Sequence, residues 1–232
     1  MLDKNLIKTK FKKSILTYSN NAPIQKEIAQ KLAGFIGKDY NSILEIGSYS
    51  GFLTKEIVQK TNFKKYLAID IIDSFDFIKD LNSNIEFINA DIETFELKEK
   101  YDLIISSSTL QWCNDFSKVV KKLQSHLSDS GKIMLAIFGK KNLYEIKETL
   151  EISLNYPDIN DIKNLFSKDA LIFDEIKTLK FNSSKDILRH LKLTGVNAIQ
   201  NNYSYSEIKK FLKIMDEKYQ NTLTYNPLYI IS

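Results

Sequence analysis

Residues 42–54 read Ser42-Ile43-Leu44-Glu45-Ile46-Gly47-Ser48-Tyr49-Ser50-Gly51-Phe52-Leu53-Thr54. A short apolar run is followed by a turn with two glycines and then by a helical pattern, so the segment predicts a strand, a tight turn and a helix N-terminus. Backbone N–H groups at such a turn face a ligand. The next apolar run, residues 66–70, ends in Asp70. A carboxylate about 20 residues past a glycine turn is placed to accept hydrogen bonds from a ribose, which predicts a nucleoside-bearing cofactor.

Length and composition indicate one α/β domain with additions. The chain has 232 residues, and its hydrophobic share of 43% suffices for a core. No segment is apolar enough to span a membrane, and the N-terminal residues lack the apolar stretch of a signal peptide. The single cysteine, Cys113, excludes an internal disulfide and a cysteine-based zinc site. We therefore expect a cytoplasmic protein without a metal. The net charge of +4 is spread over scattered lysines and does not favour a nucleic-acid partner.

Strand and helix patterns alternate through the first 140 residues. Apolar runs predict strands at 43–46, 66–70, 85–88, 101–106 and 131–138, and helical patterns lie at 54–59, 74–81 and 116–127. The run at 101–106 is almost continuously apolar, as is typical of a parallel strand covered on both faces. This alternation predicts a doubly wound parallel sheet.

Helices are expected at both ends of this sheet. Residues 1–35 predict two helices with a break before Pro23, which suits a first helical turn. The C-terminal part predicts helices at 143–154, from 161, at 183–193 and at 205–216, and strands at 175–181 and 222–231. Residues 183–219 are then a helical cap inserted between the last two strands. Such a cap can fold over the carboxyl ends of the parallel strands, where ligands bind. We expect residues 1–232 to form a single domain.

The glycine turn distinguishes between nucleoside cofactors. A dinucleotide site would have Gly-x-Gly-x-x-Gly, whereas residues 47–51 lack the middle glycine and that spacing. Glu45, two residues before the first glycine, is unfavourable beside a phosphate and suits a cationic ligand. S-adenosylmethionine carries both a sulfonium and an ammonium group.

The segment Glu45–Gly51 resembles motif I of class I S-adenosylmethionine-dependent methyltransferases, Glu/Asp-x-Gly-x-Gly-x-Gly. The resemblance implies a seven-stranded Rossmann-like sheet. It also implies that Asp70 binds the ribose, that Asp91-Ile92 contacts the adenine, and that Ser106-Ser107-Ser108 lies beside the methyl group. Tyr49 departs from the pattern, because the family usually has glycine there. Its side chain either crowds the methionine end of the cofactor or points outward.

Further stretches resemble the malonyl-[acyl-carrier protein] O-methyltransferases of biotin synthesis. They are Phe11 to Tyr18 with Ala22 and Gln25, Leu110-Gln111-Trp112-Cys113, residues 188–198, and the Leu-Thr-Tyr of residues 223–225. Trans-aconitate methyltransferases share motif I and a Gln-Trp after the fourth strand, so Gln111-Trp112 alone does not decide between the two. The implied acceptor is the free carboxylate of a malonyl thioester on acyl carrier protein, which would become a methyl ester that primes pimeloyl and biotin synthesis.

The chemistry of this acceptor predicts the types of residue that bind it and align it. A carboxylate is ionised at neutral pH and needs no general base, so catalysis should rest on proximity, alignment and exclusion of water. Recognition calls for a cation, and arginine suits it by bidentate geometry. Arg189 is the candidate, with His190 beside it. Arg189 lies nearly opposite the apolar face of its helix, which is typical of a solvated surface unless that helix caps the cleft.

The resemblance also implies roles for side chains outside motif I. Tyr18 would close over the methionine end of the cofactor with support from Gln25, and Trp112 would either pack in the core or form a wall of the acceptor pocket. Gln111 would bond the cofactor or the thioester. Basic residues of the cap offer a docking face for an acidic carrier: Lys185, Arg189, Lys192, Lys209, Lys210 and Lys213.

The predicted site comprises catalytic, cofactor-binding and substrate-binding residues. The predicted catalytic residues are Arg189, His190 and Tyr18. The predicted cofactor-binding residues are Tyr18, Gln25, Glu45, Gly47, Ser48, Gly51, Asp70, Ile71, Asp91, Ile92, Ser107 and Gln111, and the predicted substrate-binding residues are Gln111, Trp112, Arg189 and Lys192. The leading hypothesis is a carboxyl O-methyltransferase acting on malonyl-carrier. The alternatives are a methyltransferase of a small acid such as trans-aconitate and a non-catalytic module that binds S-adenosylmethionine.

Overall fold

The computed structural model describes residues 1–199 and 203–232. Residues 200–202, which belong to the expected cap, lie outside the described residues. Two helices open the chain, α1 (Lys4–Asn21) and α2 (Pro23–Ala33). The carboxylate of Asp3 caps α1 by accepting hydrogen bonds from the backbone N–H groups of Asn5 and Leu6. Pro23 begins α2, where its missing N–H costs nothing.

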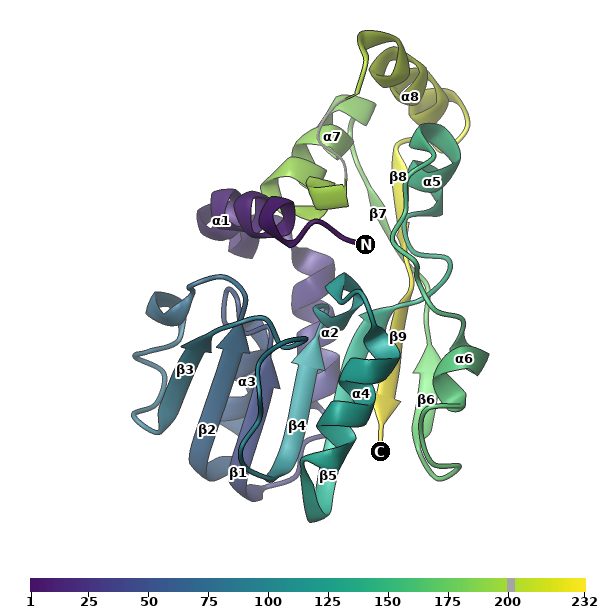
Figure 1. The fold of residues 1–232 in the computed structure, drawn as a ribbon. Helices are drawn as coiled ribbons and strands as arrows, with labels where there is room; N and C mark the ends of the chain where they lie inside the picture. The colour runs from purple at the N-terminus through teal and green to yellow at the C-terminus, as the bar shows by residue number, and fades with distance from the viewer. Residues whose placement is uncertain (200–202) are drawn as a thin grey trace.

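The main sheet has seven strands in the order β3-β2-β1-β4-β5-β9-β6. The parallel strands are β1 (Asp39–Ile46), β2 (Asn62–Asp70), β3 (Ile85–Asn89), β4 (Tyr101–Ser107) and β5 (Leu127–Phe138). The antiparallel strand β9 (Pro227–Ile231) lies between β5 and β6 (Leu171–Asp174). Figure 1 shows the resulting twisted layer with its parallel carboxyl ends at one edge. The predicted doubly wound sheet is confirmed.

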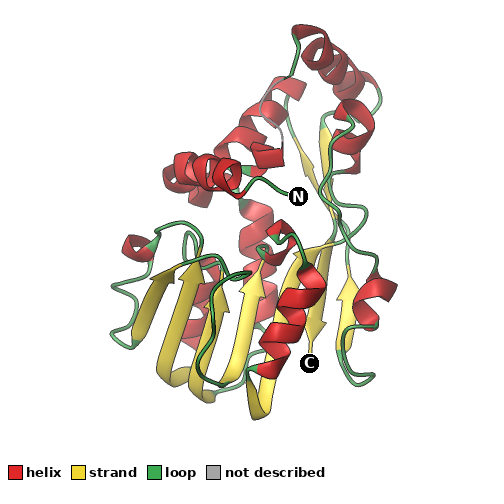
Figure 2. Cartoon of the chain, in the orientation of Figure 1, coloured by secondary structure: helices red, strands yellow, loops and turns green. Residues whose placement is uncertain are grey.

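Alternate residues of the strands face two different cores. Ile43 of β1 belongs to the core beneath α2 and α3 (Phe52–Lys60), whereas its neighbour Leu44 belongs to the core beneath α4 (Phe116–Ser125). Both side chains are fully buried. This alternation follows from the two-residue period of a strand, and it explains why strands covered on both faces read as continuous apolar runs. Figure 2 shows the helices on both sides of the strands.

The cap stands on a small second sheet. Strands β7 (Lys177–Lys180) and β8 (Thr222–Tyr225) pair antiparallel, and between them lie α7 (Ser184–Leu193), η3 (Val196–Ile199) and α8 (Tyr205–Glu217). Helix α5 (Tyr144–Leu150) packs against α8. In Figure 1, α1 and α7 lie beyond the carboxyl ends of the parallel strands. The sequence predicts these helices between the last two strands of the chain, whereas they lie between β7 and β8 of the second sheet, and β9 follows as the last strand.

Some predicted boundaries are wrong. Residues 222–231 form two strands rather than one, because Asn226 separates β8 from β9 and its side-chain amide donates hydrogen bonds to the Asp174 carboxylate and the Glu175 carbonyl. The helix predicted at 74–81 is reduced to the single turn η1 (Phe75–Phe77). Helix α5 ends at Leu150 because Glu151 takes a left-handed φ of 57°. The short helix α6 is Ile159–Lys163, and η2 is Leu110–Trp112.

Across residues 1–199 and 203–232, none of the helices has the length and apolar character that crossing a bilayer requires.

Candidate active site

A cavity opens at the carboxyl ends of β1, β2 and β4, beneath α1. The turn after β1 forms its floor, where Gly47 has a φ of 82° and a Cβ added there would lie 1.9 Å from the Thr109 hydroxyl oxygen. Only glycine fits that position. The cavity encloses about 90 Å³ and is lined by Ile7, Phe11, Tyr18, Gln25, Ala29, Gly47, Ser48, Tyr49, Ser50, Phe52, Leu53, Asp70, Ile71, Ile72, Ser107, Ser108, Thr109 and Trp112.

Asp70 lies in this cavity at the end of β2. One carboxylate oxygen accepts a hydrogen bond from the Tyr49 N–H at 2.8 Å and the other from the Ile72 N–H at 2.8 Å. Burial nevertheless raises the pKa of Asp70 to about 6. Each carboxylate oxygen accepts more than one hydrogen bond, so capacity remains for the hydroxyl groups of a ribose.

Tyr49 points under α1 rather than into solvent. Its hydroxyl donates to the Phe11 carbonyl at 2.6 Å and lies 3.0 Å from the Ser14 hydroxyl. Its ring makes edge contacts with Phe11 and Tyr18, at centroid distances of 5.5 and 4.7 Å. Of the two expected placements, the side chain takes the inward one, and it forms part of the cavity wall.

Several buried polar atoms of the cavity lack a partner. They include the Oε1 atom of Gln25 and the hydroxyl groups of Ser48, Ser107 and Ser108. A buried polar group without a hydrogen bond is costly, so these atoms indicate a polar ligand. The polar lining of the cavity, with Asp70 and these groups, therefore fits a polar cofactor such as S-adenosylmethionine.

An apolar slot adjoins Asp70 on the side of β3. It is shaped by Ile71, Ala90, Asp91, Ile92 and Cys113, together with parts of α1 and η2. Asp91 and Ile92 therefore lie where the adenine is expected. Burial raises the pKa of the Cys113 thiol to about 12, so this cysteine is not a reactive thiolate.

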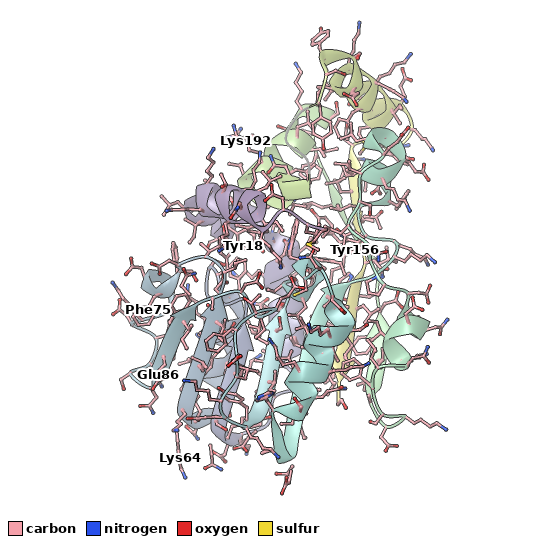
Figure 3. The ribbon with its side chains drawn as sticks, in the orientation of Figure 1. Tyr18, Lys64, Phe75, Glu86, Tyr156 and Lys192 are labelled. Carbon is pink, nitrogen blue, oxygen red and sulfur yellow. The ribbon has the colours of Figure 1, made fainter. Side chains whose placement is uncertain are left out.

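A second, smaller cavity continues from the first toward the cap. The two share Phe11, Tyr18, Gln25, Ser108 and Trp112. The second adds a set of groups from β5, the segment after it, η3 and β8: Gln111, Phe138, Asn142, Leu143, Leu154, Tyr156, Val196 and Tyr225. In Figure 3, Tyr18 and Tyr156 lie between the sheet and the cap. The second cavity therefore lies between the cofactor cavity and the cap.

Two motif I residues are not at the cavity wall. Glu45 is fully buried on the α3 face of β1, where its carboxylate accepts hydrogen bonds from the Thr54 and Tyr66 hydroxyl groups. Strand alternation turns it away from the ligand side, and burial raises its pKa to about 7. Gly51 lies behind the turn, where a φ of 75° lets the chain enter α3.

The predicted catalytic residues of α7 are not brought together with Tyr18. Arg189 and Lys192 are exposed, and neither lines the two cavities. Lys192 lies on the outer side of the cap in Figure 3. His190 is buried, and its Nε2 atom lies 2.7 Å from the Tyr225 hydroxyl. Burial lowers the pKa of His190 to about 4, so the ring is neutral.

Several residues that line the second cavity are not among the site residues predicted from the sequence. Tyr225 belongs to the Leu-Thr-Tyr pattern of residues 223–225, and this pattern is the sequence signal that points to it. Asn142 and Tyr156 stand in segments without any motif, and only the fold brings them to the second cavity.

Comparison with known proteins gives consistent matches. A family model described as a methyltransferase domain matches residues 20–172. A malonyl-[acyl-carrier protein] O-methyltransferase of Calditerrivibrio nitroreducens is 32% identical, with coverage of 97% of this chain and 94% of that protein. One from Chlorobium luteolum is 28% identical, with coverage of 99% and 95%.

Solved structures share the fold at low identity. A putative methyltransferase from Bacillus halodurans has a TM-score of 0.66 at 11% identity, covering 88% of this chain and 97% of that one. The N-methyltransferase NodS from Bradyrhizobium japonicum, solved with S-adenosyl-L-homocysteine, has a TM-score of 0.58 at 12% identity, covering 97% of both chains.

Proposed function

The chain belongs to the malonyl-[acyl-carrier protein] O-methyltransferase family, and from this membership we propose that it methylates the free carboxylate of a malonyl thioester on acyl carrier protein. S-adenosylmethionine supplies the methyl group. The product is a methyl ester, which masks the charge so that the chain can be elongated toward pimeloyl and biotin precursors.

The observation that supports this most directly is the junction of the two cavities. Tyr18, Gln25, Ser108 and Trp112 belong to both, so a cofactor in the first cavity and an acceptor in the second would meet there. The cap and α1 lie beyond the carboxyl ends of the parallel strands (Figure 1), and we expect them to exclude water from the reacting groups at this junction.

The reaction needs alignment more than acid–base chemistry. One carboxylate oxygen attacks the sulfonium methyl carbon in line with the C–S bond, which breaks to leave S-adenosylhomocysteine. No proton is transferred. Tyr18 is buried and lines both cavities, and in this proposal it orients the reacting groups, while Trp112 forms the wall against which the acceptor packs.

The exposed basic residues of the cap suit the carrier itself. Lys185, Arg189, Lys192, Lys209, Lys210 and Lys213 are all exposed on α7 and α8. We assign Arg189 and Lys192 to this docking face, because an acidic protein would be attracted to it over a distance comparable to the Debye length.

The test is label transfer from methyl-labelled S-adenosylmethionine to malonyl-carrier. The expected product is a base-labile methyl ester on the carrier, formed faster than any ester of free trans-aconitate. Absence of transfer to the carrier would refute the proposed function. Transfer to the free acid at an equal or higher kcat/KM would replace the carrier with a small acid.

A further inference from the structure

The acceptor of the proposed reaction carries a negative charge, yet the second cavity offers no cation. Among the described residues that line it, none is lysine, arginine or histidine. The polar groups there are phenols, amides, a hydroxyl and an indole N–H: Tyr18, Gln25, Ser108, Gln111, Trp112, Asn142, Tyr156 and Tyr225. Arg189, the only arginine in the chain, is exposed on the outer part of α7. Recognition of the carboxylate therefore falls to neutral donors.

Tyr225 is the most rigidly placed of these donors. It ends β8 and is 1% exposed. The preceding residue, Thr224, is anchored through its N–H and its hydroxyl to the buried carboxylate of Glu145, at 3.1 and 2.6 Å. The Tyr225 hydroxyl lies 2.7 Å from His190 Nε2. A donor fixed at both its backbone and its hydroxyl is preorganised for a ligand.

The neighbouring phenols converge on the same region. Burial raises the pKa of Tyr18, Tyr156 and Tyr225, and all three line the second cavity. These phenols are therefore protonated at neutral pH and can donate. The second cavity that they line lies between the cofactor cavity and the cap.

We propose that the Tyr225 hydroxyl, oriented by His190, binds the free carboxylate of the methyl acceptor in the second cavity. This inference rests on the proposed function. Tyr225 has one O–H, and a carboxylate can only accept, so the O–H must point to the acceptor. His190 then donates its Nε2–H to the Tyr225 oxygen, which makes His190 a positioning residue.

Neutral donors suit this reaction better than an arginine would. A carboxylate and a sulfonium lose their charges as the new C–O bond forms. A cation on the carboxylate would stabilise the charged ground state more than the transition state, and only interactions that favour the transition state raise the rate. A phenol orients the nucleophile at a smaller cost to its reactivity.

The experiment compares Tyr225→Phe with wild type in two readouts. The first is steady-state methylation of malonyl-carrier, where KM is expected to rise on the order of 10- to 100-fold, as for a lost hydrogen bond to a charged group. The second is binding of malonyl-pantetheine and of its neutral methyl ester to protein loaded with S-adenosylhomocysteine. Wild type is expected to prefer the acid, and the variant to lose that preference.

Matched variants separate this role from folding. Tyr229→Phe removes another buried hydroxyl, which bonds Glu175 at 3.0 Å and lies outside both cavities, and it should leave both readouts within twofold of wild type. His190→Leu should reproduce the Tyr225→Phe defect, and His190→Gln, which keeps a donor, should restore most of it. The double variant Tyr225→Phe/His190→Leu should be no worse than Tyr225→Phe alone.

The outcomes are distinguishable. Wild type that binds the acid but transfers no label refutes the proposed function, while the binding arm still tests Tyr225. The inference is overturned if Tyr225→Phe stays within twofold of wild type in both the KM and the preference for acid over ester. It is also overturned if Arg189→Ala abolishes the preference for the acid while Tyr225→Phe keeps it. Wild type that does not distinguish acid from ester also overturns it.

Discussion

Tyr49 is a side chain in a turn that usually needs glycine. Its φ of 34° is unfavourable for a residue with a Cβ. The cost is offset by contacts that a glycine could not make, namely the hydroxyl bonds to Phe11 and Ser14 and the edge packing on Tyr18. Tyr49 therefore fastens the cofactor turn to α1, the helix that covers it.

Tyr49→Phe should loosen this attachment without changing the turn. The variant keeps the ring contacts and loses hydrogen bonds worth about 0.5–1.5 kcal/mol each. We expect S-adenosylhomocysteine to dissociate several-fold faster. The single tryptophan, Trp112, lines the cavity and should report dissociation by stopped-flow fluorescence. Tyr40→Phe, which loses only a hydroxyl bonded to the Gly37 N–H, is the control. Equal rates in all three proteins would contradict the role of Tyr49.

Asp70 should make cofactor binding depend on pH. Burial raises the pKa of Asp70 to about 6. We propose that Asp70 binds the ribose; hydroxyl groups that donate to its ionised form would lower this pKa on binding. The Kd for S-adenosylmethionine should then rise as the pH falls from 7 to 5, as measured by calorimetry. Asp70→Asn should bind weakly and show a flat profile over the same range. A profile equally steep in Asp70→Asn would assign the titration to another group.

Sequence reasoning located the residues whose position follows from the strand ends. Asp70 and Ser107 follow directly from where β2 and β4 stop, and both line the cavity. Glu45 is predicted to bind the cofactor, but its side chain points away from the cavity toward Thr54 and Tyr66. The direction of a side chain within β1 depends on its position in the strand, which the spacing of the motif does not show. Arg189 was assigned from the chemistry of the acceptor, but the face of α7 that looks inward is set by packing against neighbouring elements.

At the scale of elements, α1 joins the cofactor turn to the cap. Gly195, just after α7, has a φ of 73°, and a Cβ there would lie 2.8 Å from the Ser14 hydroxyl and 3.1 Å from the Phe11 ring. The Thr17 hydroxyl donates to the Leu193 carbonyl at 2.9 Å. Residues of α1 that hold Tyr49 on one side thus contact the cap on the other.

Gly195→Ala should separate these elements. The added methyl group collides with α1, and the backbone conformation is unfavourable for alanine, so we expect a loss of about 1–3 kcal/mol in unfolding free energy. Hydrogen exchange of α1 and α7 amides should accelerate, whereas exchange in β1 and β4 should change only as global stability requires. Gly37→Ala, where φ is not positive, is the control. Unchanged exchange in α1 would show that this contact does not hold the cap.

Elements were predictable where local pattern and tertiary environment agree. The buried parallel strands and the amphipathic α4 were found because their burial determines their periodicity. The break at Asn226 was missed because its cause is the long-range bonding of its side chain to Asp174 and Glu175. The short strand β6 was missed because its pairing with β9 is not visible in a four-residue segment.

For the molecule as a whole, the cofactor cavity lies between the sheet and α1, and α1 in turn contacts the cap. The walls that narrow the cavity are aromatic side chains of α1 and of the adjoining turns: Phe11, Tyr18, Tyr49 and Trp112. Because α1 forms this wall and contacts the cap, we expect cofactor binding to involve α1 and the cap together.

Cofactor binding should consequently change protection across the cap and not only at the turn. Ligand at 100 times its Kd stabilises the folded state by about 2.7 kcal/mol. If α1 and α7 close over the bound cofactor as one unit, S-adenosylhomocysteine should slow hydrogen exchange in both helices together. This effect on α7 would be indirect, because Arg189 and Lys192 of α7 do not line the cavity. Gly195→Ala should keep the protection of the turn and of α1 while reducing that of α7, because the contact that couples them is lost. Protection limited to the turn in wild type would mean that the cofactor enters without moving the cap.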